Sequence, residues 1–269
     1  MRMSRQFDEN IEAIDPLETM PPAKKSMVIF FLVDTSKSME GSKLESLNRV
    51  MGDILPDLIG VGEAGTDVKV AVMSFSSGCE WITPEPVLIE EYQRWENLRA
   101  DGVTDLGDAC EELCQKLSRN SFLRAPSLSY APVIFLMTDG YPTDNYKKGF
   151  EMLKKNRWFQ YGLKIALAIG SNVDLDVLRE FTDDEELVLQ ACGAEMLKKL
   201  VREIAVTSSK IGSTSMTLTD ATGERSLAEV AGAKKEQMVE AVQEMKQDIL
   251  GMDDLTDLDD MDIEFDEGW

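Results

Sequence analysis

The chain has 269 residues, of which 43% are hydrophobic and 29% charged, a composition typical of a globular protein with one domain and some extensions. Its 28 Lys and Arg residues against 50 Asp and Glu give a net charge of −22, which excludes the cation-rich proteins that bind nucleic acids or anionic membrane surfaces. The sequence holds no histidine, so catalytic and zinc sites that depend on imidazole are excluded as well.

The cysteines and the apolar runs indicate a cytoplasmic protein. The four cysteines form no Cys-x-x-Cys pair and are typical of buried thiols in a reducing compartment. The longest apolar run, Met27–Val33, is far too short to span a bilayer, and the polar first 25 residues contain no apolar leader segment. We therefore expect a cytoplasmic location with no membrane contact.

After a polar N-terminal arm (residues 1–26), strands and helices alternate over residues 27–210. Met27–Val33 is rich in β-branched and aromatic residues, which is typical of a strand covered on both faces. Leu44–Ile59 repeats apolar residues at helical spacing. The other predicted strands are 67–75, 81–89, 133–137, 163–169 and 187–190, and the other predicted helices are 106–117, 146–158, 173–181 and 194–206. This alternation predicts an α/β fold with a doubly wound, mostly parallel, Rossmann-like sheet and helices on both faces.

The C-terminal region differs in composition from the α/β unit. Residues 211–225 are rich in Ser, Thr and Gly and are predicted to form a linker, and residues 226–251 form a predicted amphipathic helix. This helix either packs back on the domain or binds a partner. Residues 252–269 are an acidic tail with interleaved apolar residues, which is either solvated, bound to a partner, or docked on the chain's own site through Asp262 or Glu264.

Three polar motifs follow predicted strands or precede a predicted helix. The first is Asp34-Thr-Ser36-Lys-Ser38, directly after the first strand, and the others are Gly102–Asp105 and Thr138–Gly140. Each motif alone is also typical of a helix cap or a turn. Because ligand sites of such sheets lie at the carboxyl ends of the strands, we expect all three motifs to meet at one edge.

Together these motifs supply the oxygen ligands of a hard cation. Mg²⁺ prefers octahedral oxygen ligands and usually keeps several waters. We expect Ser36, Ser38 and Thr104 to bind it directly, and Asp34 and Asp139 to hold its waters. Mn²⁺ accepts the same oxygen set. The remaining position would then take a carboxylate from a partner protein.

These residues resemble the metal-ion-dependent adhesion site (MIDAS) of the von Willebrand factor type A family. Asp34, Ser36 and Ser38 match its Asp-x-Ser-x-Ser motif, and Thr104 and Asp139 match its later threonine and aspartate. The amino-acid sequences of Gly102–Gly107 and Thr138–Asp144 most resemble those of the bacterial intracellular, TerY-like group associated with tellurium resistance. That resemblance implies a scaffold or regulator in a stress-response or signalling complex, with a protein kinase or phosphatase as possible partner.

The sequence leaves several alternatives open. Lys37 stands where many family members have glycine, so it either weakens the metal site, to the point of leaving a purely structural scaffold, or pairs with an acid. Either Thr104 or Asp105 faces the ion. The chief rival function is a Mg²⁺-dependent phosphoryl-transfer enzyme of the haloacid-dehalogenase kind with Asp34 as nucleophile, although that family requires an aspartate where Ser36 stands. We expect no enzymatic activity.

Overall fold

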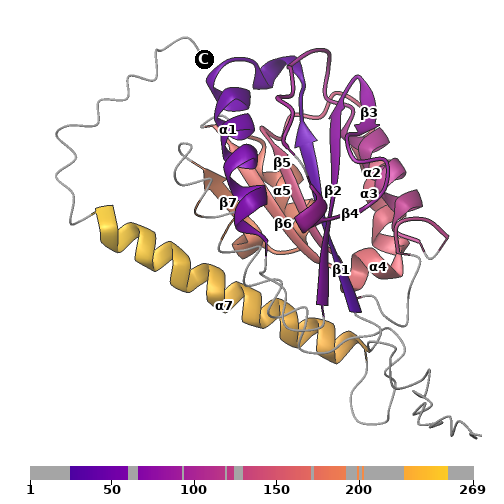
Figure 1. Ribbon diagram of the computed structural model, residues 1–269, viewed down its shortest axis with the longest axis vertical. Helices are drawn as coiled ribbons and strands as arrows, with labels where there is room; N and C mark the ends of the chain where they lie inside the picture. The colour runs from indigo at the N-terminus through magenta and orange to yellow at the C-terminus, as the bar shows by residue number, and fades with distance from the viewer. Residues whose placement is uncertain are drawn as a thin grey trace, which may run out of the picture.

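The computed structural model describes residues 25–59, 66–92, 94–118, 120–123, 130–170, 173–191, 199, 202 and 227–253. In this part of the chain a seven-stranded sheet lies between helices (Figure 1). The strands are β1 (Lys25–Asp34), β2 (Thr66–Ser76), β3 (Gly78–Trp81), β4 (Val87–Leu88), β5 (Val133–Thr138), β6 (Leu163–Ile169) and β7 (Val188–Ala191). The α-helices are α1 (Ser42–Asp57), α2 (Leu106–Lys116), α3 (Tyr146–Lys155), α4 (Arg157–Tyr161), α5 (Leu175–Thr182) and α7 (Leu227–Asp253).

The sheet is mostly parallel and has β1 at its centre. Its strand order is β3-β2-β1-β5-β6-β7, with β4 paired to β2 outside this path. β1 runs parallel to both β2 and β5, whereas β3 and β4 run antiparallel to β2. The predicted doubly wound, mostly parallel α/β fold is therefore confirmed. The chain passes from β1 outward to β2 and later returns to place β5 on the other side of β1, so the topological switch point lies between β1 and β5.

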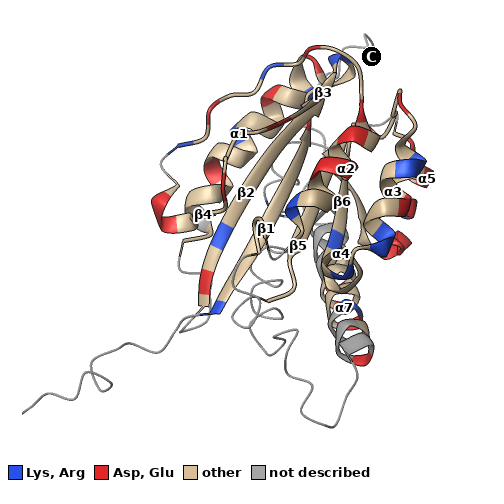
Figure 2. Cartoon of the chain, turned by 90° about the vertical axis from the view of Figure 1, so that its right-hand side faces the viewer, with Lys and Arg blue, Asp and Glu red and all other residues tan. Residues whose placement is uncertain are grey.

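Both faces of the sheet are covered, as the continuous apolar run of β1 requires. Met27, Ile29 and Phe31 pack with the buried face of α1 on one side. Phe30 and Leu32 pack on the other side with α2, α3, α4 and α5. Figure 2 shows charged residues mainly on the helices and loops, while the strands are mostly uncharged.

Two predicted elements are each divided in the structure. Of the predicted edge strand 81–89, only Trp81, the last residue of β3, and Val87–Leu88, which form β4, lie in strands. Pro84 and Pro86 stand between them, and a proline has no N–H to donate to a strand ladder. The predicted helix 146–158 is broken at Asn156. The Asn156 side chain accepts hydrogen bonds from the N–H groups of Trp158 and Phe159, which starts α4 as a new helix.

Helix α7 packs back on the domain. Met238 and Val242 are fully buried in the same apolar cluster as β1 and α1. Lys235 donates to the carbonyl of Asp183 and pairs with Asp184, with its Nζ 3.1 Å from an Asp184 carboxylate oxygen. Figure 1 places α7 at the end of the sheet opposite the carboxyl ends of the parallel strands. Of the two roles predicted for this helix, the structure favours packing.

The other predictions for the chain ends lie outside the described residues. They concern the N-terminal arm up to residue 24, most of the predicted helix 194–206, the linker 211–225 and the tail from residue 254. Within the part of the chain that the structure describes, no helix combines the length and apolar character needed to cross a membrane.

Candidate metal centre

The three predicted motifs meet at the carboxyl edge of the sheet, at the switch point. Asp34 is the last residue of β1, and Asp139 directly follows β5. The loop that carries Thr104 lies against the loop after β1. Two backbone hydrogen bonds join these loops, from Lys37 N–H to the Gly102 carbonyl at 3.0 Å and from Asp101 N–H to the Thr35 carbonyl at 2.9 Å. The fold therefore brings the predicted site residues to one place.

Asp34 is fully buried and fixed in orientation through both carboxylate oxygens. Its Oδ1 accepts from the Ser36 N–H at 2.8 Å, and its Oδ2 accepts from the Thr138 hydroxyl. The Gly140 N–H in turn donates to the Thr138 hydroxyl oxygen at 2.9 Å. Burial raises the pKa of Asp34 to about 6, because the charged form loses its water, although the hydrogen bonds oppose this shift. A nearby cation would offset that loss of solvation.

The two serine hydroxyls of the first motif lie side by side. Ser36 Oγ and Ser38 Oγ are 2.9 Å apart and hydrogen bonded. Two neighbouring oxygens of an octahedral Mg²⁺ site, each at the usual ~2.0–2.1 Å from the ion, are separated by about the same 2.9 Å. Ser36 is buried and Ser38 is exposed, so the pair lies where the interior meets the surface. Their spacing suits a shared ion.

Thr104 and Asp105 have different neighbours. The Asp105 carboxylate accepts a hydrogen bond from the Gly78 N–H at 2.9 Å, so it holds the turn between β2 and β3. Thr104 is 4% exposed, and its backbone is held by Thr143. The Thr104 N–H donates to the Thr143 hydroxyl, and its carbonyl accepts from the Thr143 N–H at 2.9 Å. Of the two candidates left open by the sequence, Thr104 is therefore the one whose side chain is not used by the turn.

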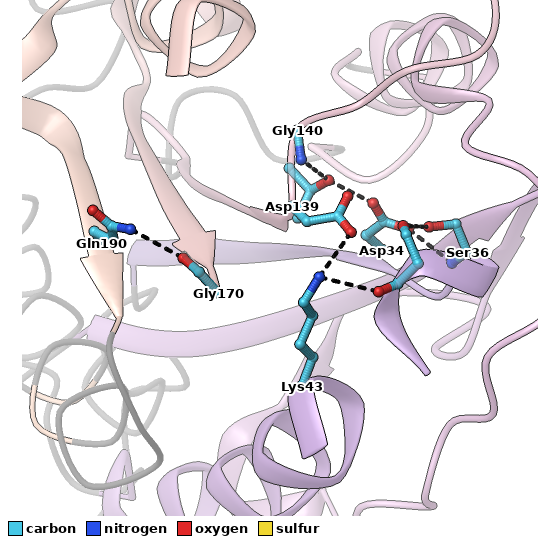
Figure 3. A network of polar contacts seen from close by, with 9 residues as sticks. Asp34, Ser36, Lys43, Asp139, Gly140, Gly170 and Gln190 are labelled. Atoms are coloured by element: carbon cyan, nitrogen blue, oxygen red, sulfur yellow. Dashed lines mark hydrogen bonds and ion pairs between the residues drawn. The ribbon is translucent and has the colours of Figure 1, made fainter. Parts of the chain in front are cut away.

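Asp139 carries an orphaned oxygen. Its side chain is almost fully buried, and its Oδ2 lies 3.3 Å from the ammonium nitrogen of Lys43 (Figure 3). Its Oδ1 is buried without a hydrogen-bond partner among the described residues. Burying an acceptor in this way costs about 1–3 kcal/mol unless something else satisfies it. A bound cation, or a water held by one, would do so.

The comparisons with known proteins identify the family. A profile of the von Willebrand factor type A domain matches residues 29–203. The chain belongs to this family. Domains of the family commonly bind protein partners through a divalent cation held at the MIDAS. The placement of the five predicted residues at the switch point of this type A domain agrees with such a site.

Individual relatives of this type A domain are distant. The human inter-alpha-trypsin inhibitor heavy chain H6 is 25% identical over 211 residues, which cover 70% of this chain and 15% of that protein. The bovine heavy chain H1 is 26% identical over 165 residues, covering 56% of this chain and 17% of that protein. This chain thus spans under a fifth of the length of these curated relatives.

A solved structure of a von Willebrand factor type A protein from Catenulispora acidiphila matches with a TM-score of 0.51 and 19% identity, over 70% of this chain and 43% of that chain. Proximal thread matrix protein 1 from the mussel byssus, solved with a zinc-occupied MIDAS motif, matches with a TM-score of 0.50 and 18% identity, over 70% of this chain and 46% of its own. At these identities the likeness shows the fold.

The donor set of this type A domain fits a hard cation. It consists of hydroxyl and carboxylate oxygens, including the orphaned Asp139 Oδ1. No group of three or more His, Cys, Asp or Glu side chains able to hold a metal occurs in the described part of the chain, so hydroxyls are needed to complete the site. Neutral hydroxyls and carboxylates are ligands of hard divalent cations, whereas no thiolate or imidazole stands among the predicted ligands.

The lysine that the sequence singled out, Lys37, is not the one that contacts the predicted site residues. Lys37 points into solvent, where it pairs with Glu40 at 2.7 Å, and both side chains are more than half exposed. The predicted pairing with an acid is therefore observed, and an effect of Lys37 on metal affinity stays a prediction. The lysine at the site is Lys43, on the first turn of α1. Lys43 and Asp139 are 96 residues apart, so no local sequence pattern indicated that they are in contact.

The structure also adds Thr143, which sequence reasoning did not single out. We expect Thr143→Val to weaken Mg²⁺ binding about tenfold, in the range seen when residues that orient metal ligands are removed. The valine loses the hydroxyl that accepts from Thr104 N–H at 3.1 Å and donates to the Thr104 carbonyl at 3.2 Å. Isothermal titration with MgCl₂ measures the effect. Thr143→Ser keeps the hydroxyl and serves as the control, and equal affinities for both variants would contradict the positioning role.

Proposed function

We propose that this chain is a metal-ion-dependent protein-interaction module that binds an acidic residue of a partner protein at a Mg²⁺-loaded MIDAS. Ser36, Ser38 and Thr104 would bind the ion directly, and Asp34 and Asp139 would hold its waters. The observation that carries the proposal is the orphaned Asp139 oxygen, buried at the switch point where all three motif loops meet. A buried acceptor without a partner is rare in folded proteins and is typical of a site that binds something.

The chain's own residues explain why such a site would bind rather than catalyse. When bound, a divalent cation supplies positive charge and an open coordination position for a carboxylate oxygen. Ser36, Ser38 and Thr104 contribute neutral hydroxyls, which leave most of that charge uncompensated. Both carboxylate oxygens of Asp34 accept hydrogen bonds, from the Ser36 N–H and the Thr138 hydroxyl, so Asp34 would contact the cation through a water molecule. Uncompensated charge at the edge of the sheet attracts an acidic side chain.

The same contacts argue against a phosphoryl-transfer enzyme. A nucleophilic aspartate must reach its substrate, whereas Asp34 is 0% exposed and both of its oxygens accept hydrogen bonds. The aspartate that the haloacid-dehalogenase family requires two residues later is replaced by Ser36. Without histidine, the chain also lacks the usual general base near neutral pH. These observations support a binding role.

The finer assignment rests on the sequence motifs. We place the chain in the cytoplasmic, TerY-like group associated with tellurium resistance, as a scaffold or regulator in a bacterial stress-response complex that includes a protein kinase or phosphatase. The amino-acid sequences of Gly102–Gly107 and Thr138–Asp144 support the assignment to this group. The three described cysteines are free thiols, which supports a reducing compartment, although the predicted burial holds for Cys110 alone: Cys114 is partly buried and Cys79 is exposed.

We expect partners captured from native lysate with Mg²⁺ to be lost when EDTA replaces Mg²⁺ and when Asp34→Ala or Ser38→Ala is the bait. Asp34 is buried and its loss disturbs the loop, whereas Ser38 is exposed, so Ser38→Ala isolates the metal effect from folding. Ser42→Ala, another exposed serine four residues along the chain, is the matched control and retains the partners. Identical partner lists with Mg²⁺ and with EDTA would refute metal-dependent docking.

A further inference from the structure

The Lys43 side chain reaches into the proposed metal site. Lys43 stands on the first turn of α1, and its ammonium nitrogen lies 3.3 Å from Asp139 Oδ2 and 3.1 Å from the Ser38 carbonyl oxygen. Figure 3 shows this ammonium between the loops after β1 and β5. The Lys43 side chain is 14% exposed and that of Asp139 is 2% exposed, so the pair is largely shielded from solvent.

A glycine leaves room for the Lys43 side chain beside the site. Gly170, which follows β6, has φ +98° and lies against the lysine stem, since a Cβ on it would come within 2.9 Å of Lys43 Cε. A larger residue at Gly170 would therefore displace the lysine. Gly170 thus leaves space for the stem of the lysine that reaches Asp139.

We propose that the Lys43 ammonium is a tethered cation that neutralises Asp139 in the metal-free chain and competes with the divalent cation for the site. This inference rests on the proposed metal-binding function. Lys43 and the metal both draw on the Asp139 carboxylate, and two cations held within a few ångströms of each other repel. Because the pair is shielded from solvent, salt weakens this repulsion less than it would at the surface.

Because the two cations compete, removal of the Lys43 ammonium should have opposite effects on stability and on metal binding. Removing the ammonium leaves both Asp139 oxygens without a cation in the metal-free chain, so the metal-free chain becomes less stable. The same removal abolishes the repulsion toward the metal, so divalent-cation binding becomes tighter. A substitution that simply damaged the fold would lower both the stability of the metal-free chain and its affinity for the divalent cation.

The test compares wild type with Lys43→Met by isothermal titration with MgCl₂ and MnCl₂ and by thermal unfolding in EDTA and in Mg²⁺. We expect Lys43→Met to bind Mg²⁺ at least about tenfold more tightly. Its melting temperature in EDTA should fall by roughly 2–6 °C, and the increase on adding Mg²⁺ should exceed that of wild type. Lys43→Gln, which places a neutral donor at the same position, should also bind Mg²⁺ more tightly and unfold at a lower temperature in EDTA, as Lys43→Met does.

Lys37→Met is the matched control, because Lys37 lies only six residues before Lys43 in the sequence but pairs with Glu40 in solvent, so neither readout should change. Equal or weaker Mg²⁺ binding by Lys43→Met and Lys43→Gln, in a chain whose wild type binds Mg²⁺, would overturn the proposal for Lys43 and leave the proposed function intact. If wild type and both variants bind neither Mg²⁺ nor Mn²⁺, the proposed function fails and the proposal for Lys43 fails with it.

Discussion

Thr104→Val should reduce Mg²⁺ affinity by more than about a hundredfold, which is beyond the loss typical of residues that only orient a ligand. Valine has nearly the shape of threonine but no oxygen, so the substitution removes one proposed ligand and little else. The hydrogen bonds that hold Thr104 to Thr143 use the backbone N–H and carbonyl of Thr104, and these remain. Isothermal titration with MgCl₂ measures the loss.

Thr104→Ser is the matched control, because it keeps the hydroxyl and should bind Mg²⁺ within a few-fold of wild type. Thermal unfolding in EDTA separates a lost ligand from a damaged fold, since the melting temperatures of both variants should stay close to that of wild type. Full Mg²⁺ affinity in Thr104→Val would remove Thr104 from the ligand set. Asp105 would be a poor replacement, since its carboxylate is occupied by the Gly78 N–H.

The contrast between Thr104 and Lys43 shows what the sequence could predict. The first motif begins at Asp34, the last residue of β1, and a strand of continuous apolar residues is recognisable by its composition. Once β1 and β5 are taken as neighbouring parallel strands, the residues at their carboxyl ends must converge. Asp34 and Asp139 were therefore predictable as neighbours from local signals and one rule of topology.

Contacts that depend on how helices pack on the sheet were not predictable. Lys43 follows Ser42 in an ordinary helix start, and nothing nearby in the sequence distinguishes it from a surface lysine such as Lys37. Only the placement of α1 beside β5 and β6, with room left by Gly170, directs its ammonium to Asp139. Likewise, the sequence pattern places Asn156 inside one continuous helix, whereas in the structure its side chain caps the start of α4.

Replacing Met238 by alanine should destabilise the chain by about 2–5 kcal/mol, the usual loss for truncating a buried methionine. Met238 is fully buried on α7 and belongs to the apolar cluster built on β1 and α1, although some 200 residues separate it from them in sequence. The helix touches the segment Glu185–Leu187 before β7 and the helix α4. Urea denaturation followed by far-ultraviolet circular dichroism gives the free energy of unfolding.

Gln237→Ala is the matched control, because the adjacent Gln237 is exposed on the same helix and its truncation should change the stability by less than about 0.5 kcal/mol. If Met238→Ala leaves the free energy of unfolding unchanged, α7 does not pack on the domain in solution, and its apolar stripe is then available to a partner. A large loss in Met238→Ala instead makes α7 part of the domain's core. In that case the proposed MIDAS at the opposite end of the sheet remains the candidate partner-binding surface, and Mg²⁺ affinity should survive the substitution wherever the chain stays folded.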